Sequence, residues 1–323
     1  MRSPKRIVAI TVSALLAGIS TALAAEPAWP DKPIRLVVGS AAGSGPDIIA
    51  RVMADRLYGV WGQRVVVDPR PGVAGLLSAD IVTRAAADGY TWMMMTSQLF
   101  VATIVYSNHK VNLARDFASI SLIGTVPYVL VVHPSVARTI PELIEAGKKS
   151  PGMLRYGSAG AGGGEHITSF LFGHMAGANF LHVPYKGIPQ ALSDTVAREV
   201  HFATPVLAVA LPFVHSGRLR ALGVTTRKRV ALLPDVAPVA DILPGYENFG
   251  WYSLVVPTGT RPDILAKVNT EVVKAVKEPQ FGEQLKSLGI DLVGSTRAEF
   301  DAFRRNETRR LGDIVKASGL DLK

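Results

Sequence analysis

The sequence contains no cysteine among its 323 residues. This absence excludes a disulfide framework, a thiol nucleophile and a lipid anchor attached at an export cleavage site. Two catalytic motifs are missing as well, because there is no P-loop and no serine in a Gly-x-Ser-x-Gly elbow. The seven histidines show no spacing typical of a zinc site. We therefore expect no enzyme activity, no cofactor and no metal, and a fold that relies on a large hydrophobic core.

Long apolar runs are scarce, and the one at the N-terminus is short. Three basic residues at positions 2, 5 and 6 precede an apolar stretch over 7–19, which is too short to span a bilayer. Ala22-Leu23-Ala24 then fits the small-x-small pattern of a cleavage site. We expect a signal peptide over residues 1–24, cleaved near Ala24/Ala25, and a mature protein in the periplasm that is not lipidated. A retained membrane anchor is the alternative.

Charge of one sign is only mildly in excess. The formal net charge is +9, and removing the three basic residues of the signal leaves 35 − 3 = 32 basic against 26 acidic residues, or +6. Export argues against a nucleic-acid partner. A modest positive field favours acidic solutes.

Predicted strands and helices alternate along the remaining chain, which is typical of an α/β protein with mostly parallel sheets. Apolar and β-branched stretches predict strands over 34–38, 65–67, 90–95, 119–124, 128–133, 180–183, 200–204, 219–225 and 251–256. Helical spacing predicts helices over 47–57, 76–86, 165–175, 189–197, 209–216, 262–276, 279–288 and 296–318, with a further helix start at Thr139. The expected mature length, 323 − 24 = 299 residues, indicates two domains.

Two loops of small residues, over 39–45 and 157–164, each connect a predicted strand to a predicted helix. Residues this small let a ligand approach the backbone closely. The N–H groups that open the following helix favour an anion. Two such loops indicate two half-sites for one small acidic molecule, whereas two ordinary strand-to-helix turns are the alternative.

The candidate ligand-binding residues follow from these loops and from neighbouring strand ends. The first loop supplies Ser40, Ala41, Ala42, Gly43, Ser44 and Gly45, and the second supplies Ser158, Ala159, Gly160, Ala161 and Gly162. Asp47 opens a helix, where capping and ligand contact are both open roles. Strand ends and helix starts add Thr96, Ser97, His166, Tyr185 and Thr204.

Several short motifs in a fixed order carry a family resemblance. They include Trp29-Pro30-Asp31-Lys32-Pro33, Ala87-Asp88-Gly89-Tyr90, His182-Val183-Pro184-Tyr185-Lys186-Gly187, Leu233-Pro234-Asp235 and Trp251-Tyr252. With these motifs the chain resembles the Bug-type (TctC-like) solute-binding proteins of tripartite tricarboxylate transporters. The resemblance implies a two-domain Venus-flytrap periplasmic binding protein (type II-like) with the ligand cleft between the domains. It also implies a ligand carboxylate that meets both loops, and hinge closure around it.

The resemblance further implies that the chain crosses twice between its domains, near Val126-Pro127 and Gly250-Trp251. Domain I is then 25–126 plus 252–323 and domain II is 127–251. Trp251 and Tyr252 are expected to pack at the hinge. The chain is expected to act as a monomer that hands its ligand to integral-membrane transporter subunits.

Two departures from the family pattern bear on the ligand. Small residues at 40–42 stand where the family has bulkier ones, and the stretch around Thr204 lacks the family's usual aspartate. A buried ammonium without a charged partner is costly. We therefore expect a non-amino dicarboxylate with an apolar or aromatic body, such as terephthalate. An exported ligand sensor and an exported hydrolase or scaffold are the alternatives.

Overall fold

The computed structural model describes residues 29–106 and 108–318. The expected signal peptide and its cleavage site lie outside the described residues. Within the described ranges, no helix is both long enough and apolar enough to cross a membrane.

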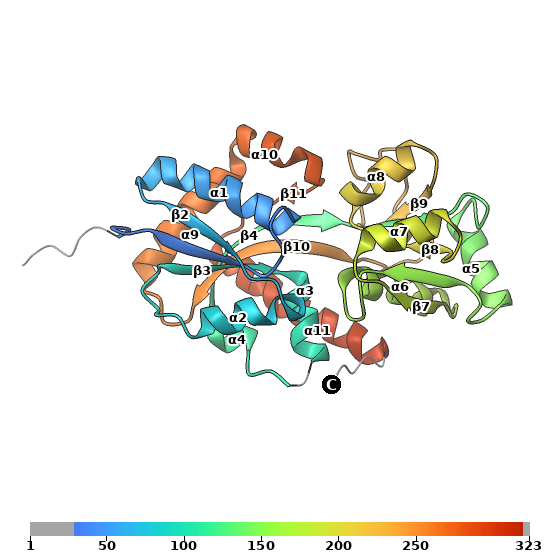
Figure 1. The fold of residues 1–323 in the computed structure, drawn as a ribbon, viewed down its shortest axis with the longest axis horizontal. Coiled ribbons are helices and arrows are strands. Elements are labelled where there is room, and N and C mark those ends of the chain that lie inside the picture. The colour runs from blue at the N-terminus through green and yellow to red at the C-terminus, as the bar shows by residue number, and fades with distance from the viewer. Residues whose placement is uncertain (1–28, 107, 319–323) are drawn as a thin grey trace, which may run out of the picture.

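The strands form two sheets, and each sheet is the centre of one lobe (Figure 1). The sheet of the first lobe has the order β11-β4-β10-β3-β1-β2, and that of the second lobe has the order β7-β6-β8-β5-β9. The strands are β1 (Ile34–Val38), β2 (Val65–Pro69), β3 (Thr91–Thr96), β4 (Phe117–Pro127), β5 (Val129–Val132), β6 (Arg155–Ser158), β7 (Leu181–Pro184), β8 (Phe202–Ala203), β9 (Arg220–Val224), β10 (Phe249–Pro257) and β11 (Asp291–Leu292).

Helices cover both faces of each sheet. They are α1 (Gly45–Trp61), α2 (Leu76–Thr83), α3 (Ser97–Val105), α4 (Leu113–Asp116), α5 (Ile140–Lys149), α6 (Gly164–Ala176), α7 (Ile188–Val196), α8 (Leu207–His215), α9 (Pro262–Lys277), α10 (Pro279–Leu285) and α11 (Arg297–Ser318). Short 3₁₀ turns are η1 (Val73–Gly75), η2 (Val239–Asp241) and η3 (Lys286–Leu288).

Alternation along the buried strands divides the core of the first lobe into two layers. In β1, Leu36 and Val38 pack toward α1, α9 and α10, whereas Val37 packs toward α2, α3 and α11. Successive strand side chains point to opposite faces, so a strand that is apolar throughout feeds both layers. The second lobe repeats this arrangement around β5, whose alternate residues join its two clusters.

The chain passes between the lobes at two adjacent places. β4 and β10 pair antiparallel, and their ends meet where Gly250 faces Val126 and Phe249 faces Pro127. Figure 1 shows these two strands as the ribbons that join the lobes. Tyr128, which stands between β4 and β5, receives a backbone hydrogen bond from Thr225 in the second lobe. The crossing is therefore a pair of hydrogen-bonded strands.

The C-terminal helix α11 braces this crossing. Arg310 donates to both carboxylate oxygens of Glu307 and to the side-chain oxygen of Asn248, at 2.7 to 3.0 Å. Trp251 donates its indole N–H to Glu307 at 3.1 Å, and Asn248 donates to Thr168 of α6 at 2.6 Å. A chain of hydrogen bonds thus links α11 to the first turns of α6 in the other lobe.

Several details of the predicted secondary structure were wrong, and the short elements α4 and β11 were not predicted. The sheets are mixed, not mostly parallel, because β4 and β10 carry the chain in opposite directions and β5 is antiparallel to β8 and β9. Helix α3 was missed, since five of its nine residues are buried and apolar and it shows no amphipathic period. The strand predicted over 200–204 is reduced to Phe202–Ala203.

Candidate functional site

A pocket of 220 Å³ lies where the crossing strands meet the first small-residue loop. Its walls come from the first loop, the start of α3, the crossing strands and the start of α8. They consist of Ser40, Ser44, Pro46, Thr96, Ser97, Gln98, Val126, Tyr128, Val206, Gly250 and Tyr252. The lining contains hydroxyl, amide and apolar side chains, and none of these residues carries a charge. We call this cavity the interlobe pocket.

Two residues of α1, Asp47 and Arg51, stabilise the conformation of the first loop. Asp47 is buried, and its carboxylate accepts the Gly43 N–H at 2.8 Å and two hydrogen bonds from Arg51 at 2.9 and 3.1 Å. Burial raises the pKa of this carboxyl, but the bonds from Arg51 and Gly43 outweigh burial and hold the pKa below its ordinary value. Ala41 and Ala42 are exposed. Both carboxylate oxygens of Asp47 are thus engaged in hydrogen bonds that fix the conformation of the first loop.

Two helix N-termini in this region lack a side-chain cap. Ser44 is the N-cap of α1 and Thr96 is the N-cap of α3, and neither side chain accepts a bond from its helix. The Ser44 hydroxyl is buried and has no hydrogen-bond partner in the described part of the chain. The first N–H groups of a helix have no partner within that helix. The region therefore offers unused donors and the positive ends of two helix dipoles.

Two tyrosines of the crossing lie against glycines at the starts of α6 and α1. A Cβ on Gly164, the first residue of α6, would lie 2.0 Å from the Tyr128 hydroxyl. A Cβ on Gly45, at the start of α1, would lie 3.2 Å from the Tyr252 hydroxyl. Glycine is required at 164 because the phenol occupies the place of a side chain. Burial raises the pKa of both phenols.

The polar groups of the second loop form hydrogen bonds within the loop and with two nearby histidines. The Ser158 hydroxyl is within 2.7 Å of His182 Nε2, and it also bonds to the backbone N–H and carbonyl of Gly160 at 3.2 and 3.0 Å. The Gly162 N–H donates to His166 Nδ1 at 3.0 Å. His166 and His182 stack with ring centres 3.7 Å apart. The loop's polar groups that the sequence assigns to a ligand are therefore engaged with each other.

The two stacked histidines are neutral. Burial lowers the pKa of His166 to about 3, with a smaller contribution from His182, and burial lowers the pKa of His182 to about 4. A neutral His166 can accept the Gly162 N–H, whereas an ionised imidazole has no free acceptor. The shape of the second loop thus depends on an uncharged pair of rings.

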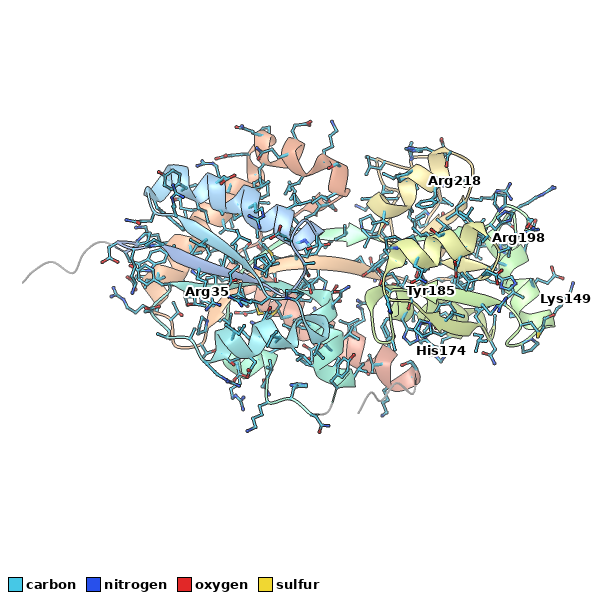
Figure 2. The ribbon with its side chains drawn as sticks, viewed as in Figure 1. Arg35, Lys149, His174, Tyr185, Arg198 and Arg218 are labelled. Carbon is cyan, nitrogen blue, oxygen red and sulfur yellow. The ribbon has the colours of Figure 1, made fainter. Side chains whose placement is uncertain are left out.

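Thr204 and Tyr185 lie beside the second loop and not in the interlobe pocket. Thr204 is fully buried, where its hydroxyl donates to the Glu165 carbonyl at 2.8 Å and pairs with Ser169 at 2.8 Å. The half-buried Tyr185 donates its backbone N–H to the Ser158 carbonyl at 2.9 Å. Burial and the neighbouring Asp194 raise the pKa of Tyr185 to about 12. Figure 2 shows Tyr185 on the second lobe.

The structure gathers some of the predicted site residues and separates others. Ser40, Ser44, Thr96 and Ser97 line one pocket, as strand ends and a loop at the same sheet edge should. The predicted residues of the second loop do not line it, although α6 begins against Tyr128. Lys149 and Arg198 lie at the end of the second lobe away from the first lobe (Figure 2).

Sequence reasoning missed seven residues of the pocket, three of which are Pro46, Val126 and Gly250, and one residue near it. Gln98, Tyr128, Val206 and Tyr252 line the pocket from elements that meet only in the folded chain. Glu165 is 5% exposed, and its Oε2 has no partner within the described ranges. In the sequence this glutamate looks like the acidic residue common in the first turn of a helix.

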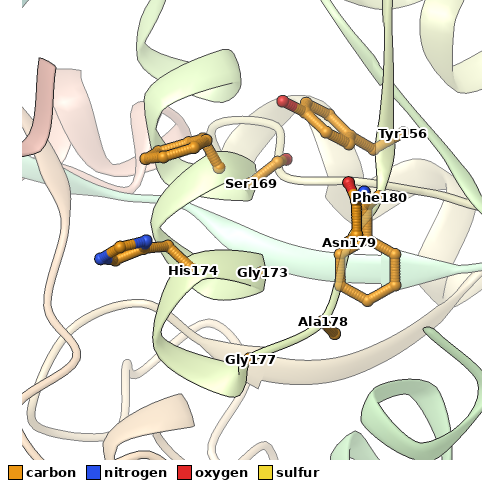
Figure 3. Close-up of a pocket in the computed structure, with 9 residues that line it drawn as sticks. Tyr156, Ser169, Gly173, His174, Gly177, Ala178, Asn179 and Phe180 are labelled. Atoms are coloured by element: carbon orange, nitrogen blue, oxygen red, sulfur yellow. The ribbon is translucent and has the colours of Figure 1, made fainter. Parts of the chain in front are cut away.

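Another cavity, of 370 Å³, lies within the second lobe alone (Figure 3). It is lined by Tyr156, Ser169, Phe170, Gly173, His174, Gly177, Ala178, Asn179 and Phe180. None of the predicted site residues contributes to it. Across the described ranges, no group of three or more His, Asp or Glu side chains could hold a metal ion.

Comparison with known proteins identifies the type of molecule. The family model described as "Tripartite tricarboxylate transporter family receptor" matches residues 49–320. A curated relative from Pseudomonas sp. (strain P51), named "UPF0065 protein in tcbD-tcbE intergenic region", is 35% identical over 311 residues, which is 93% of each chain.

Solved structures agree in fold. The structure described as "R. palustris Rpa4515 with adipate" superposes with a TM-score of 0.81 at 30% identity, covering 91% of this chain and 99% of that one. The structure of the periplasmic binding protein BugD gives a TM-score of 0.77 at 26% identity, covering 91% and 100%. BugD is described as a periplasmic binding protein, and the shared fold confirms the predicted fold class.

Proposed function

This chain belongs to the tripartite tricarboxylate transporter receptor family, and we propose that it captures a small dicarboxylate in the interlobe pocket. Membership confirms the predicted resemblance, and it makes the chain a solute-binding receptor of a family of periplasmic binding proteins, not an enzyme. The proposal adds the chemistry of the ligand, the residues that hold it and delivery to integral-membrane subunits of the transporter.

We propose that the protein acts as a monomer with two domains. Domain I is 25–126 plus 252–323, and domain II is 127–251. The sheet topology supports this division, because β4 and β10 belong to one sheet and β5 to β9 to the other. A signal peptide over residues 1–24 would place the mature protein in the periplasm.

One observation carries the proposal: the interlobe pocket combines two uncapped helix N-termini with a buried hydroxyl that has no partner within the described ranges. A carboxylate at this place would accept hydrogen bonds from the Ser44 hydroxyl and from N–H groups that open α1 and α3. Helix N-termini favour an anion, and a cavity with little water strengthens these bonds. A lysine or arginine is therefore not required for recognition.

The ligand class follows from the shape of the lining. Pro46, Val126 and Val206 add apolar side chains to a lining that is otherwise mainly polar. Such side chains suit the body of a dicarboxylate, whether an aliphatic chain or a ring such as that of terephthalate. Adipate, which accompanies the 30% identical R. palustris protein in its structure, is a dicarboxylate of the aliphatic kind. The lining supplies no ionised acid to pair with a ligand ammonium, which favours a non-amino ligand.

The test is a thermal-shift and calorimetry panel on the mature protein, with adipate, terephthalate, citrate, aspartate and glutamate. A ligand at 100 times its Kd should stabilise the protein by about 2.7 kcal/mol. Each ligand should be recovered unchanged, whereas a hydrolase would consume it. Tightest binding to aspartate or glutamate would contradict the ligand class, and no response to any carboxylate would contradict the function.

A further inference from the structure

Glu165 does not itself line the interlobe pocket, but one oxygen of its buried carboxyl group lacks a hydrogen-bond partner in the described part of the chain. It is the second residue of α6, and its neighbour Gly164 touches the Tyr128 hydroxyl. Its Oε2 is buried, and no hydrogen-bond partner for that atom exists in the described part of the chain. After burial, the charge of Glu165 is the next cause that raises the pKa of both Tyr128 and Tyr252.

The ionisable groups on the surrounding elements do not neutralise this acid. From the crossing strands come two phenols, Tyr128 and Tyr252. From α11 come Glu307 and Arg310, which bond to each other. On α6 itself, the neighbouring imidazole is turned toward Gly162 and the histidine of β7. No cation within residues 29–106 and 108–318 forms an ion pair with Glu165, and its backbone carbonyl is held by Thr204.

An ionised carboxylate at this place would repel an anionic ligand, but a neutral carboxylic acid would attract it. Burial raises the pKa of Glu165, which already favours the neutral acid in the free protein. A protonated carboxyl has one O–H donor, and a carboxylate acceptor gives that bond its greatest strength. The arrival of a second negative charge favours the protonated form still further.

We propose that Glu165 is a specificity-determining residue that binds one ligand carboxylate as a neutral acid. Wherever Glu165 is ionised in the free protein, binding is accompanied by uptake of one proton from solvent, and the resulting carboxylic acid donates a hydrogen bond to a carboxylate oxygen of the ligand. No covalent bond of the ligand breaks, and the complex carries the charge of ligand, protein and one added proton. The inference rests on the proposed function and adds a proton as a co-ligand.

The experiment is calorimetry of adipate binding to the mature protein from about pH 6 to about pH 9, where the ligand carboxyl groups are ionised. Each titration is repeated in buffers of different ionisation enthalpy, which measures protons taken up. Affinity should be highest below the pKa of Glu165 in the free protein. Above that pKa it should fall by about tenfold per pH unit, while proton uptake rises toward one per adipate.

Two variants separate this role from a merely structural one. Glu165→Gln keeps a donor that cannot titrate, so its proton uptake should vanish and its affinity should become independent of pH. Glu145→Gln, on the exposed surface of α5, is the matched control and should keep the wild-type pH profile. The wild-type profile tests the proposal by itself if Glu165→Gln does not fold.

The outcomes distinguish the two levels of the claim. Adipate binding with no proton uptake and a flat pH profile would overturn the role of Glu165 and leave the proposed function intact. Tighter binding as pH rises, with loss of binding in Glu165→Gln, would show an ionised acceptor and would also overturn it. A failure of every dicarboxylate to bind would overturn the proposed function, and the role of Glu165 with it.

Discussion

The two small-residue loops look alike in sequence but differ in what they leave free. Asp47, which is paired with Arg51, stabilises the first loop through a hydrogen bond from Gly43. At the interlobe pocket, the Ser44 hydroxyl of this loop has no partner among the described residues. In the second loop, Ser158 and Gly162 are already bonded to the imidazole pair. A glycine-rich strand-to-helix turn is therefore a site only where its donors remain unpaired. The second lobe contributes instead through α6, which brings Gly164 and Glu165 to the crossing.

The largest effect should come from separating α6 from the crossing. In Gly164→Ala the new Cβ would lie 2.0 Å from the Tyr128 hydroxyl, so the helix or the tyrosine must move. We expect a loss of stability of about 1–3 kcal/mol and a loss of adipate affinity of about 100-fold. Calorimetry and thermal unfolding measure both quantities.

Gly163→Ala is the matched control for this variant. The nearest atom to its new Cβ is 3.4 Å away, and φ at 163 is −71°, which any residue adopts. It should behave as the wild type does. Equal affinities for adipate in the two variants would contradict a role for the Gly164 contact.

A second test uses low pH to weaken the second loop, by protonating the two histidines to which it bonds. Because the folded pKa values of His166 and His182 lie at about 3 and about 4, the unfolded chain binds more protons below its ordinary histidine pKa of about 6.5. The free energy of unfolding should therefore fall as pH drops from about 6.5 toward about 4. Urea unfolding along this range measures the slope. His166→Asn, which keeps an acceptor for the Gly162 N–H, should have a smaller slope, and an unchanged slope would refute the assignment.

A pair of serine variants sharpens the comparison further. Ser44→Ala removes a buried hydroxyl that no described group bonds, so unfolding stability should stay equal or rise slightly while adipate affinity falls by about tenfold. Ser158→Ala removes a hydroxyl with three bonds, so stability should fall by about 1–2 kcal/mol. Chemical denaturation and calorimetry give the two quantities for each variant. The same direction of change in both stabilities would contradict the distinction between the loops.

The smallest effect should come from removing the ion pair between Arg51 and Asp47, which supports the first loop. Arg51 is half exposed, and its loss leaves the bond from Gly43 to Asp47 in place. Arg51→Gln should cost less than about 1 kcal/mol and leave adipate affinity within a factor of about two. A loss of affinity as large as that of Ser44→Ala would show that Arg51 acts on the ligand.

Local sequence patterns predict most strands, most helices and both loops, because those features depend on neighbouring residues. Helix α3 was missed because Leu99, Phe100 and Val101 are buried together and give no helical period. Thr204 was expected at the cleft, yet α6 covers it and uses its hydroxyl for the Glu165 carbonyl. The pocket tyrosines and Glu165 come together only through the crossing of the two lobes, and no pattern within one segment encodes that contact.

Amide hydrogen exchange with and without adipate tests the central claim most directly, since it reports which backbone donors the ligand occupies. We predict that adipate slows exchange at the N–H groups of Gly45 and Asp47, which open α1, and at those of 97–99, which open α3, and leaves Gly160 and Gly162 unchanged. Slowed exchange confined to 158–162, with none at α1 or α3, would contradict the account.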